Sequence, residues 1–116
     1  MNKFLSLGVV ISVYKNDDPI HLIQSLESIS IKQTRKPNQI ILIIDGQISN
    51  KLLEVINTWY DLNKHSILIV IKKNSTNIGL TKSLNKAIKL CSSDYIARMD
   101  SDDISISERF ELQINF

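Results

Sequence analysis

The stretch Tyr95-Ile96-Ala97-Arg98-Met99-Asp100-Ser101-Asp102-Asp103 joins a short apolar run to three carboxylates within four residues. Where a strand of an α/β sheet stops, such carboxylates would project from the sheet edge at which these proteins bind ligands. Three negative charges so close repel one another unless a cation or hydrogen-bond donors compensate them. One interpretation is a carboxylate site for Mg²⁺ or Mn²⁺ that also holds a phosphate-bearing substrate. The other is an acidic turn before a short helix, capped through Ser105-Ile106-Ser107-Glu108.

Length and composition set limits on the rest of the chain. The 116 residues are enough for one domain, and the net charge of +2 is too small to indicate nucleic-acid binding. Cys91 is the only cysteine, which excludes an internal disulfide and suits a reducing compartment, most simply the cytoplasm. No apolar run approaches the roughly 20 residues of a membrane span.

Four apolar runs predict strands, and helical periodicity fills the intervals between them. The strands are expected at Leu7–Val13, Gln39–Ile44, Ile67–Ile71 and Asp94–Met99. The first is nearly continuous in β-branched residues, which is typical of a strand covered on both faces, as in a parallel sheet. The helices are expected from Pro19 to about Ser30, from Asn50 to about Asn63, from Leu80 to Cys91, and from Ile106 to about Asn115.

This alternation predicts an α/β fold, a three-layer αβα sandwich with a mostly parallel sheet and right-handed crossovers. Polar residues then gather at the carboxyl ends of the strands, namely Tyr14, Asp45, Asn77 and Asp100 to Asp103. Their convergence favours a ligand site over a helix cap.

Five motifs in this order resemble the N-terminal half of an inverting family 2 glycosyltransferase with the GT-A nucleotide-sugar-binding fold. They are Ile11-Ser12-Val13-Tyr14, Leu26-Glu27-Ser28-Ile29 with Gln33-Thr34, Ile40 to Gly46, Asn77-Ile78-Gly79-Leu80 with Asn85, and Asp100-Ser101-Asp102-Asp103. The forms that these motifs take in this chain are most similar to those of bacterial enzymes that build capsular, exopolysaccharide or lipopolysaccharide sugars. The resemblance implies transfer of a sugar from a metal-bound nucleotide-diphospho-sugar, such as a UDP-sugar, to a glycan or lipid-linked acceptor.

The resemblance also implies roles for individual residues. Asp102, with Asp100, would hold Mn²⁺ or Mg²⁺, and Asp103 would be a nearby second acid. Asp45 would bind the uracil edge and Tyr14 would pack against the base, whereas Asn85 is a weaker candidate. The implied nucleotide-binding set is Ser12, Tyr14, Asp45, Asn77, Gly79, Asp100 and Ser101. Arg98 is expected to restrain the acidic loop through a salt bridge.

Two departures from the family pattern limit these expectations. Ile44 stands where the family often has a first acid, so Asp45 alone must serve. The acceptor site and the general base of the family lie beyond the position that matches Phe116. We therefore expect residues 1–116 to be the donor-nucleotide part of a single truncated GT-A domain, inactive alone and prone to self-association through its open edge. A lipid-linked acceptor would bring the protein to the inner face of the membrane.

Other classes fit the sequence less well. An EF-hand matches Asp100, Asp102 and Glu111 but has Ile104 and Ser105 at loop positions that need a ligand and a glycine. A phosphoacceptor signalling module lacks its target aspartate after the third strand, and a nucleotidyltransferase lacks its glycine-rich phosphate loop. A non-catalytic nucleotide-sugar-binding or interaction module remains as the alternative.

Overall fold

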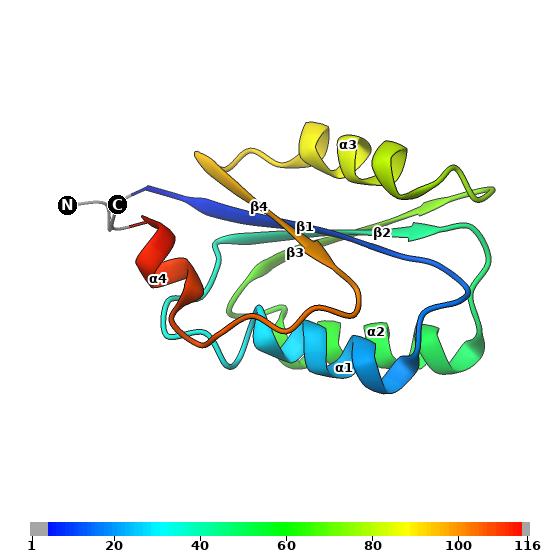
Figure 1. The fold of residues 1–116 in the computed structure, drawn as a ribbon, viewed down its shortest axis with the longest axis horizontal. Coiled ribbons are helices and arrows are strands. Elements are labelled where there is room, and N and C mark those ends of the chain that lie inside the picture. Colours follow the sequence, from blue (N-terminus) through cyan, green and yellow to red (C-terminus); the bar gives the residue numbers. More distant parts are fainter. Residues whose placement is uncertain (1–4, 115–116) are drawn as a thin grey trace.

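The chain folds into a four-stranded sheet between two layers of helices, as the sequence predicts (Figure 1). The computed structural model describes residues 5–114. The strands are β1 (Leu7–Val13), β2 (Gln39–Asp45), β3 (Leu68–Asn74) and β4 (Tyr95–Asp100). The helices are α1 (Pro19–Ser28), α2 (Asn50–Asn63), α3 (Leu80–Leu90) and α4 (Arg109–Ile114).

The sheet has the order β3-β2-β1-β4, and every neighbouring pair of strands is parallel. Because the chain starts in the middle of the sheet, β1 pairs both with β2 and with the last strand, β4. Helices α1 and α2 cover one face of the sheet and α3 covers the other (Figure 1). The prediction of a three-layer, mostly parallel α/β fold is confirmed.

Both faces of the two central strands are buried, which explains why their sequences are almost uninterrupted in apolar residues. Alternate residues point to opposite faces. Thus Val9 and Ile11 of β1 join the core beneath α1 and α2, whereas Val10 joins Leu84 and Ala87 beneath α3. Trp59 lies in the first of these cores, as expected for a packing residue.

The helix starts follow from local capping. Asp18 accepts hydrogen bonds from the backbone N–H groups of Ile20 and His21 and caps α1. The hydrogen bond from His21 first, and then that from Ile20, hold the pKa of Asp18 below its usual value. Ser49 caps α2 in the same way by accepting from the backbone N–H of Leu52.

The last helix differs from the expectation. It begins at Arg109 rather than Ile106, and its expected end at Asn115 lies outside the described residues. Ser105 does not cap it, since its hydroxyl accepts a hydrogen bond from the Arg109 guanidinium and its N–H donates to Ser28. The prediction of a capping box is therefore wrong, because hydrogen bonds to residues far away in the sequence hold this segment in a non-helical conformation. Across residues 5–114, no helix combines the length and apolar character needed to cross a bilayer.

Candidate functional site

A cleft of about 400 Å³ opens at the carboxyl ends of β1, β2 and β4, beside the start of α3. Its lining contains every residue expected to bind the nucleotide or the metal: Ser12, Tyr14, Asp45, Asn77, Gly79, Asp100, Ser101 and Asp102. Asp17 and Leu80 also line it and were not expected from the sequence. The parallel register explains the convergence, because Ser12 of β1 lies beside Asp100 of β4 at the same edge.

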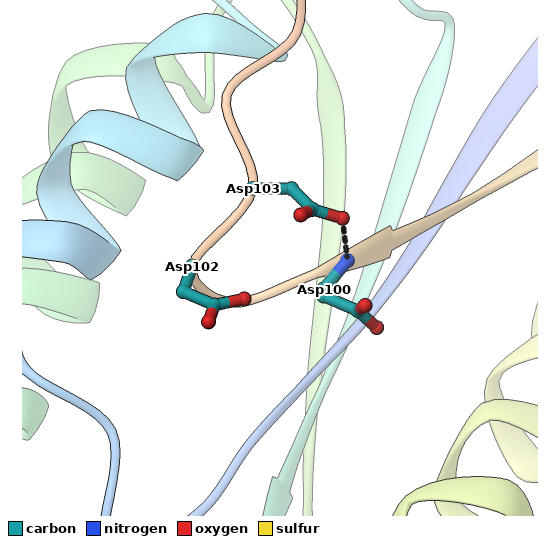
Figure 2. A group of neighbouring side chains, drawn as sticks. All are labelled: Asp100, Asp102 and Asp103. Carbon is teal, nitrogen blue, oxygen red and sulfur yellow. Dashed lines mark hydrogen bonds between the residues drawn. The ribbon is translucent and has the colours of Figure 1, made fainter.

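The acidic cluster consists of Asp100, Asp102 and Asp103 (Figure 2), and Asp100 and Asp102 line the cleft. Asp100 ends β4, while Asp102 and Asp103 lie in the turn that follows, and all three are exposed. One carboxylate oxygen of each lies within 4.8 Å of the other two. Ligands of an octahedral Mg²⁺ are about 3.0 Å apart when adjacent and about 4.2 Å apart when opposite, so these oxygens would have to move closer together to share a cation. Hard oxygen ligands without His or Cys suit Mg²⁺ or Mn²⁺.

Within the cluster, Asp103 has a different environment from the other two acids. Its carboxylate accepts a hydrogen bond of 3.4 Å from the backbone N–H of Asp100, drawn in Figure 2. The Asp103 N–H donates in return to the Asp100 carbonyl at 3.1 Å. Asp103 therefore closes the turn, and the side chains of Asp100 and Asp102 have more freedom to meet a ligand.

Asp45 is buried at the opposite wall of the cleft, with only 3% of its surface exposed. One carboxylate oxygen accepts from Asn74 Nδ2 at 2.9 Å and from the Ile78 N–H at 2.8 Å. The other accepts from the Gly79 N–H at 3.0 Å. Burial raises the pKa of Asp45, but the hydrogen bonds from Ile78, Asn74 and Gly79 outweigh it and hold the pKa below its usual value.

Further contacts extend this arrangement into β3 and α3. The side chain of Asn74 also donates to the Ser83 hydroxyl, and its amide oxygen Oδ1 accepts from Lys86 Nζ at 2.7 Å. The sequence predicted that the third strand ends at Ile71, but β3 continues to Asn74, which pairs with Asp45 across the sheet. Asp45 thereby links the ends of two strands to the start of a helix.

The loop before α3 depends on two glycines with positive φ. Gly79, the N-cap of α3, has φ 95° and ψ 161°, a conformation that is essentially restricted to glycine. Gly46 has φ 86°, and a Cβ there would lie 3.0 Å from the backbone nitrogen of Asn77. The two loops therefore touch through backbone at the rim of the cleft. Asn85 is exposed on α3 and does not line the cleft.

The end of β1 supplies the third wall. Tyr14 is 40% exposed, and its backbone N–H donates to the Asp17 carboxylate at 2.9 Å. The Asp17 N–H donates in return to the Tyr14 carbonyl. The turn-forming residues Asn16, Asp17, Asp18 and Pro19 directly after the first strand are the signal in the sequence that could have revealed Asp17.

Arg98 does not have the role predicted for it. In residues 5–114 the one ion pair joins Lys64 to Asp61, on α2 and far along the chain from the acidic loop. The guanidinium that does reach the loop belongs to Arg109, which donates to the Arg98 carbonyl and to Ser105.

A larger depression of about 590 Å³ lies between α1 and α2. Its lining is mainly apolar and includes Ile20, Ile23 and Leu62. None of the three clustered acids lines it.

The model of the family described as "Glycosyl transferase family 2" matches residues 9–116. The chain belongs to this family. It is 40% identical over 109 residues to the amylovoran biosynthesis glycosyltransferase AmsE of Erwinia amylovora, covering 94% of this chain and 39% of that protein. It is 34% identical to an Escherichia coli protein, UDP-Gal:alpha-D-GlcNAc-diphosphoundecaprenol beta-1,3-galactosyltransferase, covering 94% of this chain and 38% of that protein. This family 2 chain thus spans about two fifths of the length of these relatives.

Solved structures show the same fold at low sequence identity. S. aureus TarS in complex with UDP superposes with a TM-score of 0.77 at 18% identity, covering 94% of this chain and 31% of that one. The mannosyltransferase PcManGT from Pyrobaculum calidifontis, in complex with GDP-Man and Mn²⁺, gives a TM-score of 0.72 at 13% identity, covering 86% and 28%. The second of these neighbours is a mannosyltransferase, and the GT-A fold predicted for this family 2 chain is confirmed.

Proposed function

We propose that residues 1–116 are the donor-nucleotide-binding part of a glycosyltransferase that acts in bacterial polysaccharide biosynthesis. The donor is a nucleotide-diphospho-sugar, a UDP-sugar, and the acceptor is a glycan or a lipid-linked glycan. The names of the relatives support this proposal, because one belongs to amylovoran biosynthesis and another uses UDP-Gal with a diphosphoundecaprenol-linked acceptor.

The charge of the cleft is the observation that carries the proposal. Its lining includes the carboxylates of Asp17, Asp45, Asp100 and Asp102, and no Lys or Arg is among the lining residues that the structure describes. A diphosphate entering such a site meets like charge at close range. Binding of an anionic donor therefore requires a cation, and the oxygens of Asp100 and Asp102 are the ligands that fit it.

The bound Mn²⁺ or Mg²⁺ would neutralise the charge that accumulates on the departing nucleoside diphosphate. The protein's own contribution is to bind and orient the donor. The exposed ring of Tyr14 offers a stacking surface for the base. The Asp45 carboxylate lines the cleft and would accept an N–H of the base beside the bonds that it accepts from Asn74, Ile78 and Gly79.

The remaining residues of the set shape the site around the donor. Ser12 and Ser101 line the cleft beside the acids and can donate hydroxyl hydrogen bonds to ribose or phosphate oxygens. Asn77 and Gly79 form the rim at the start of α3. We assign no general base to these residues, so their task in the reaction is to hold the donor.

Isothermal titration of UDP into the chain, with Mn²⁺ and with excess EDTA, tests the proposal. We expect binding that needs Mn²⁺ and that Asp102→Ala abolishes. Asp61→Ala is the matched control, because Asp61 is also an exposed aspartate but lies on α2 away from the cleft. Circular dichroism checks that each variant is folded. A folded chain that ignores UDP in the presence of Mn²⁺, or that binds equally well in EDTA, would contradict the proposal.

A further inference from the structure

The acidic loop, residues 101–108, has no helix or strand of its own. It is nevertheless tied to a distant part of the chain, α1 and the connection that follows it. Four residues make the hydrogen bonds between these two parts of the chain. We call them the α1 clamp: Ser25, Ser28, Gln33 and Thr34.

Two serines on the buried face of α1 hold the two ends of the acidic turn. The Ser25 hydroxyl donates to the carbonyl oxygen of Asp100 at 3.2 Å. The Ser28 hydroxyl accepts from the Ser105 N–H at 3.0 Å and donates to the Ser25 carbonyl at 2.7 Å. Both serines are fully or almost fully buried, so water does not compete for these bonds.

Gln33 fixes the next segment of the loop with its whole side-chain amide. Nε2 donates to the Ile106 carbonyl at 2.7 Å and to the Ser28 carbonyl at 2.8 Å. Oε1 accepts from the Phe110 N–H at 3.2 Å. With 2% of its surface exposed, Gln33 has three buried bonds that join α1, the acidic loop and α4.

Thr34 continues the same contact, since its N–H donates to the Ser107 carbonyl at 2.8 Å. The clamp therefore holds the acidic loop at Asp100, Ser105, Ile106 and Ser107. By contrast, the exposed carboxylate of Asp102 depends for its place on the path of the loop itself.

We propose that Ser28 and Gln33 are positioning residues for the cation site formed by Asp100 and Asp102. This inference rests on the proposed function, because it assumes that the acids bind a cation. Clustered carboxylates repel one another, so a loose loop would spread them apart and would have to be ordered again on binding. Groups that orient metal ligands typically contribute about 10–100-fold to metal affinity, and we expect a loss of that size without the clamp.

The chain offers a matched control for Ser28. Ser30 is equally buried; its hydroxyl donates to the Leu26 carbonyl at 2.6 Å and accepts from Trp59 Nε1 at 3.0 Å. Ser28→Ala and Ser30→Ala thus each remove one donated and one accepted bond at neighbouring positions. Only Ser28 contacts the acidic loop. Gln33→Met is a second test variant, because it keeps the volume of the side chain while removing its hydrogen bonds.

The experiment measures two quantities on the unmodified chain and on four variants, Ser28→Ala, Ser28→Thr, Ser30→Ala and Gln33→Met. Mn²⁺ is titrated alone and with UDP, with free Mn²⁺ followed by electron paramagnetic resonance. Hydrogen exchange of residues 100–108 is followed by mass spectrometry. We expect Ser28→Ala and Gln33→Met to weaken Mn²⁺ binding about 10–100-fold and to speed exchange in the loop. Ser30→Ala should lower the melting temperature to a similar extent yet leave both quantities unchanged, and Ser28→Thr, which keeps the hydroxyl, should restore them.

The outcomes separate this inference from the proposed function. Equal Mn²⁺ affinity in Ser28→Ala, Ser30→Ala and the unmodified chain overturns the positioning role while leaving the nucleotide site intact. Unchanged hydrogen exchange in the clamp variants overturns it even if UDP does not bind. An unmodified chain that binds Mn²⁺ but not UDP contradicts the proposed donor alone, and the comparison of variants with Mn²⁺ still decides the clamp. A chain that binds no Mn²⁺ overturns both.

Discussion

Replacing Asp45 by asparagine tests whether this carboxylate is a structural centre of the cleft. The asparagine side chain would keep one oxygen for the bonds from Asn74 and Ile78 but would lose the acceptor of the Gly79 N–H. Leaving a buried donor unsatisfied costs about 1–3 kcal/mol. Loss of a negative charge near the N-terminus of α3 removes about another 0.3–1 kcal/mol. We therefore expect Asp45→Asn to lower the free energy of unfolding by about 1–4 kcal/mol at neutral pH.

The dependence on pH identifies the charge as the cause. The pKa of Asp45 in the folded chain lies below its usual value, so its stabilisation is complete above the unfolded pKa of about 3.9. It is lost as the pH falls through the lower pKa of the folded state. The difference between the unmodified chain and Asp45→Asn should thus be constant from about pH 7 to 5 and narrow below about pH 4.

Urea unfolding followed by Trp59 fluorescence across this pH range measures the difference. Asp18→Asn is the control, because Asp18 also has a lowered pKa but asparagine caps a helix about as well as aspartate. That variant should lose little stability at any pH. An Asp45→Asn chain as stable as the unmodified one, or a difference that persists undiminished at about pH 2.5, would refute the reasoning.

Three further predictions concern the rim and the edges of the molecule. In Gly79→Ala the new Cβ meets no neighbouring atom, but the alanine must adopt φ 95°. The free energy of unfolding, measured by thermal unfolding, should therefore fall by about 1–3 kcal/mol, and an unchanged melting temperature would contradict this backbone strain. Tyr14→Ala should weaken Mn²⁺-dependent UDP binding by about 1–3 kcal/mol, the usual worth of stacking on a base, and an identical titration would exclude stacking. The open edge of β4, with exposed Tyr95 and Ile96, should cause self-association, which light scattering would disprove by giving the 13.2 kDa monomer at all concentrations.

The sequence predicted the architecture well because that information is local. The central strands β1 and β2 are almost uninterrupted apolar runs, and α2 begins at the expected Asn50 because Ser49 is an ordinary N-cap. Most of the cleft residues were also predictable, since parallel strands bring their carboxyl ends to one edge, but Asp17 and Leu80 were not. Their roles in binding remain predictions.

The differences arise where contacts between distant residues decide the structure. Asparagine is common in turns, but the hydrogen bond from Asn74 to Asp45 extends β3 to include Asn74. Likewise, Ser105 and Ile106 match a helix start, and their bonds to Ser28 and Gln33 hold them outside α4. Arg98 was paired with the acids from its proximity in the sequence alone, whereas β4 carries it in an exposed position at the sheet edge. None of these partners is near in sequence, so no local pattern could reveal them.

The central place of β1 in the sheet has a consequence for the order of folding. Its contact with β4 closes a long loop, as shown by the hydrogen bond between Ser6 and Asp94, which are 88 residues apart. The pairing of β1, β2 and β3 needs much shorter loops and should form earlier, because loop closure costs more entropy for longer loops. The acidic turn would then be assembled last, when β4 docks and the α1 clamp engages. Partial opening under mild denaturant should release this same segment first, so that ligand binding would fail before the rest of the sheet unfolds.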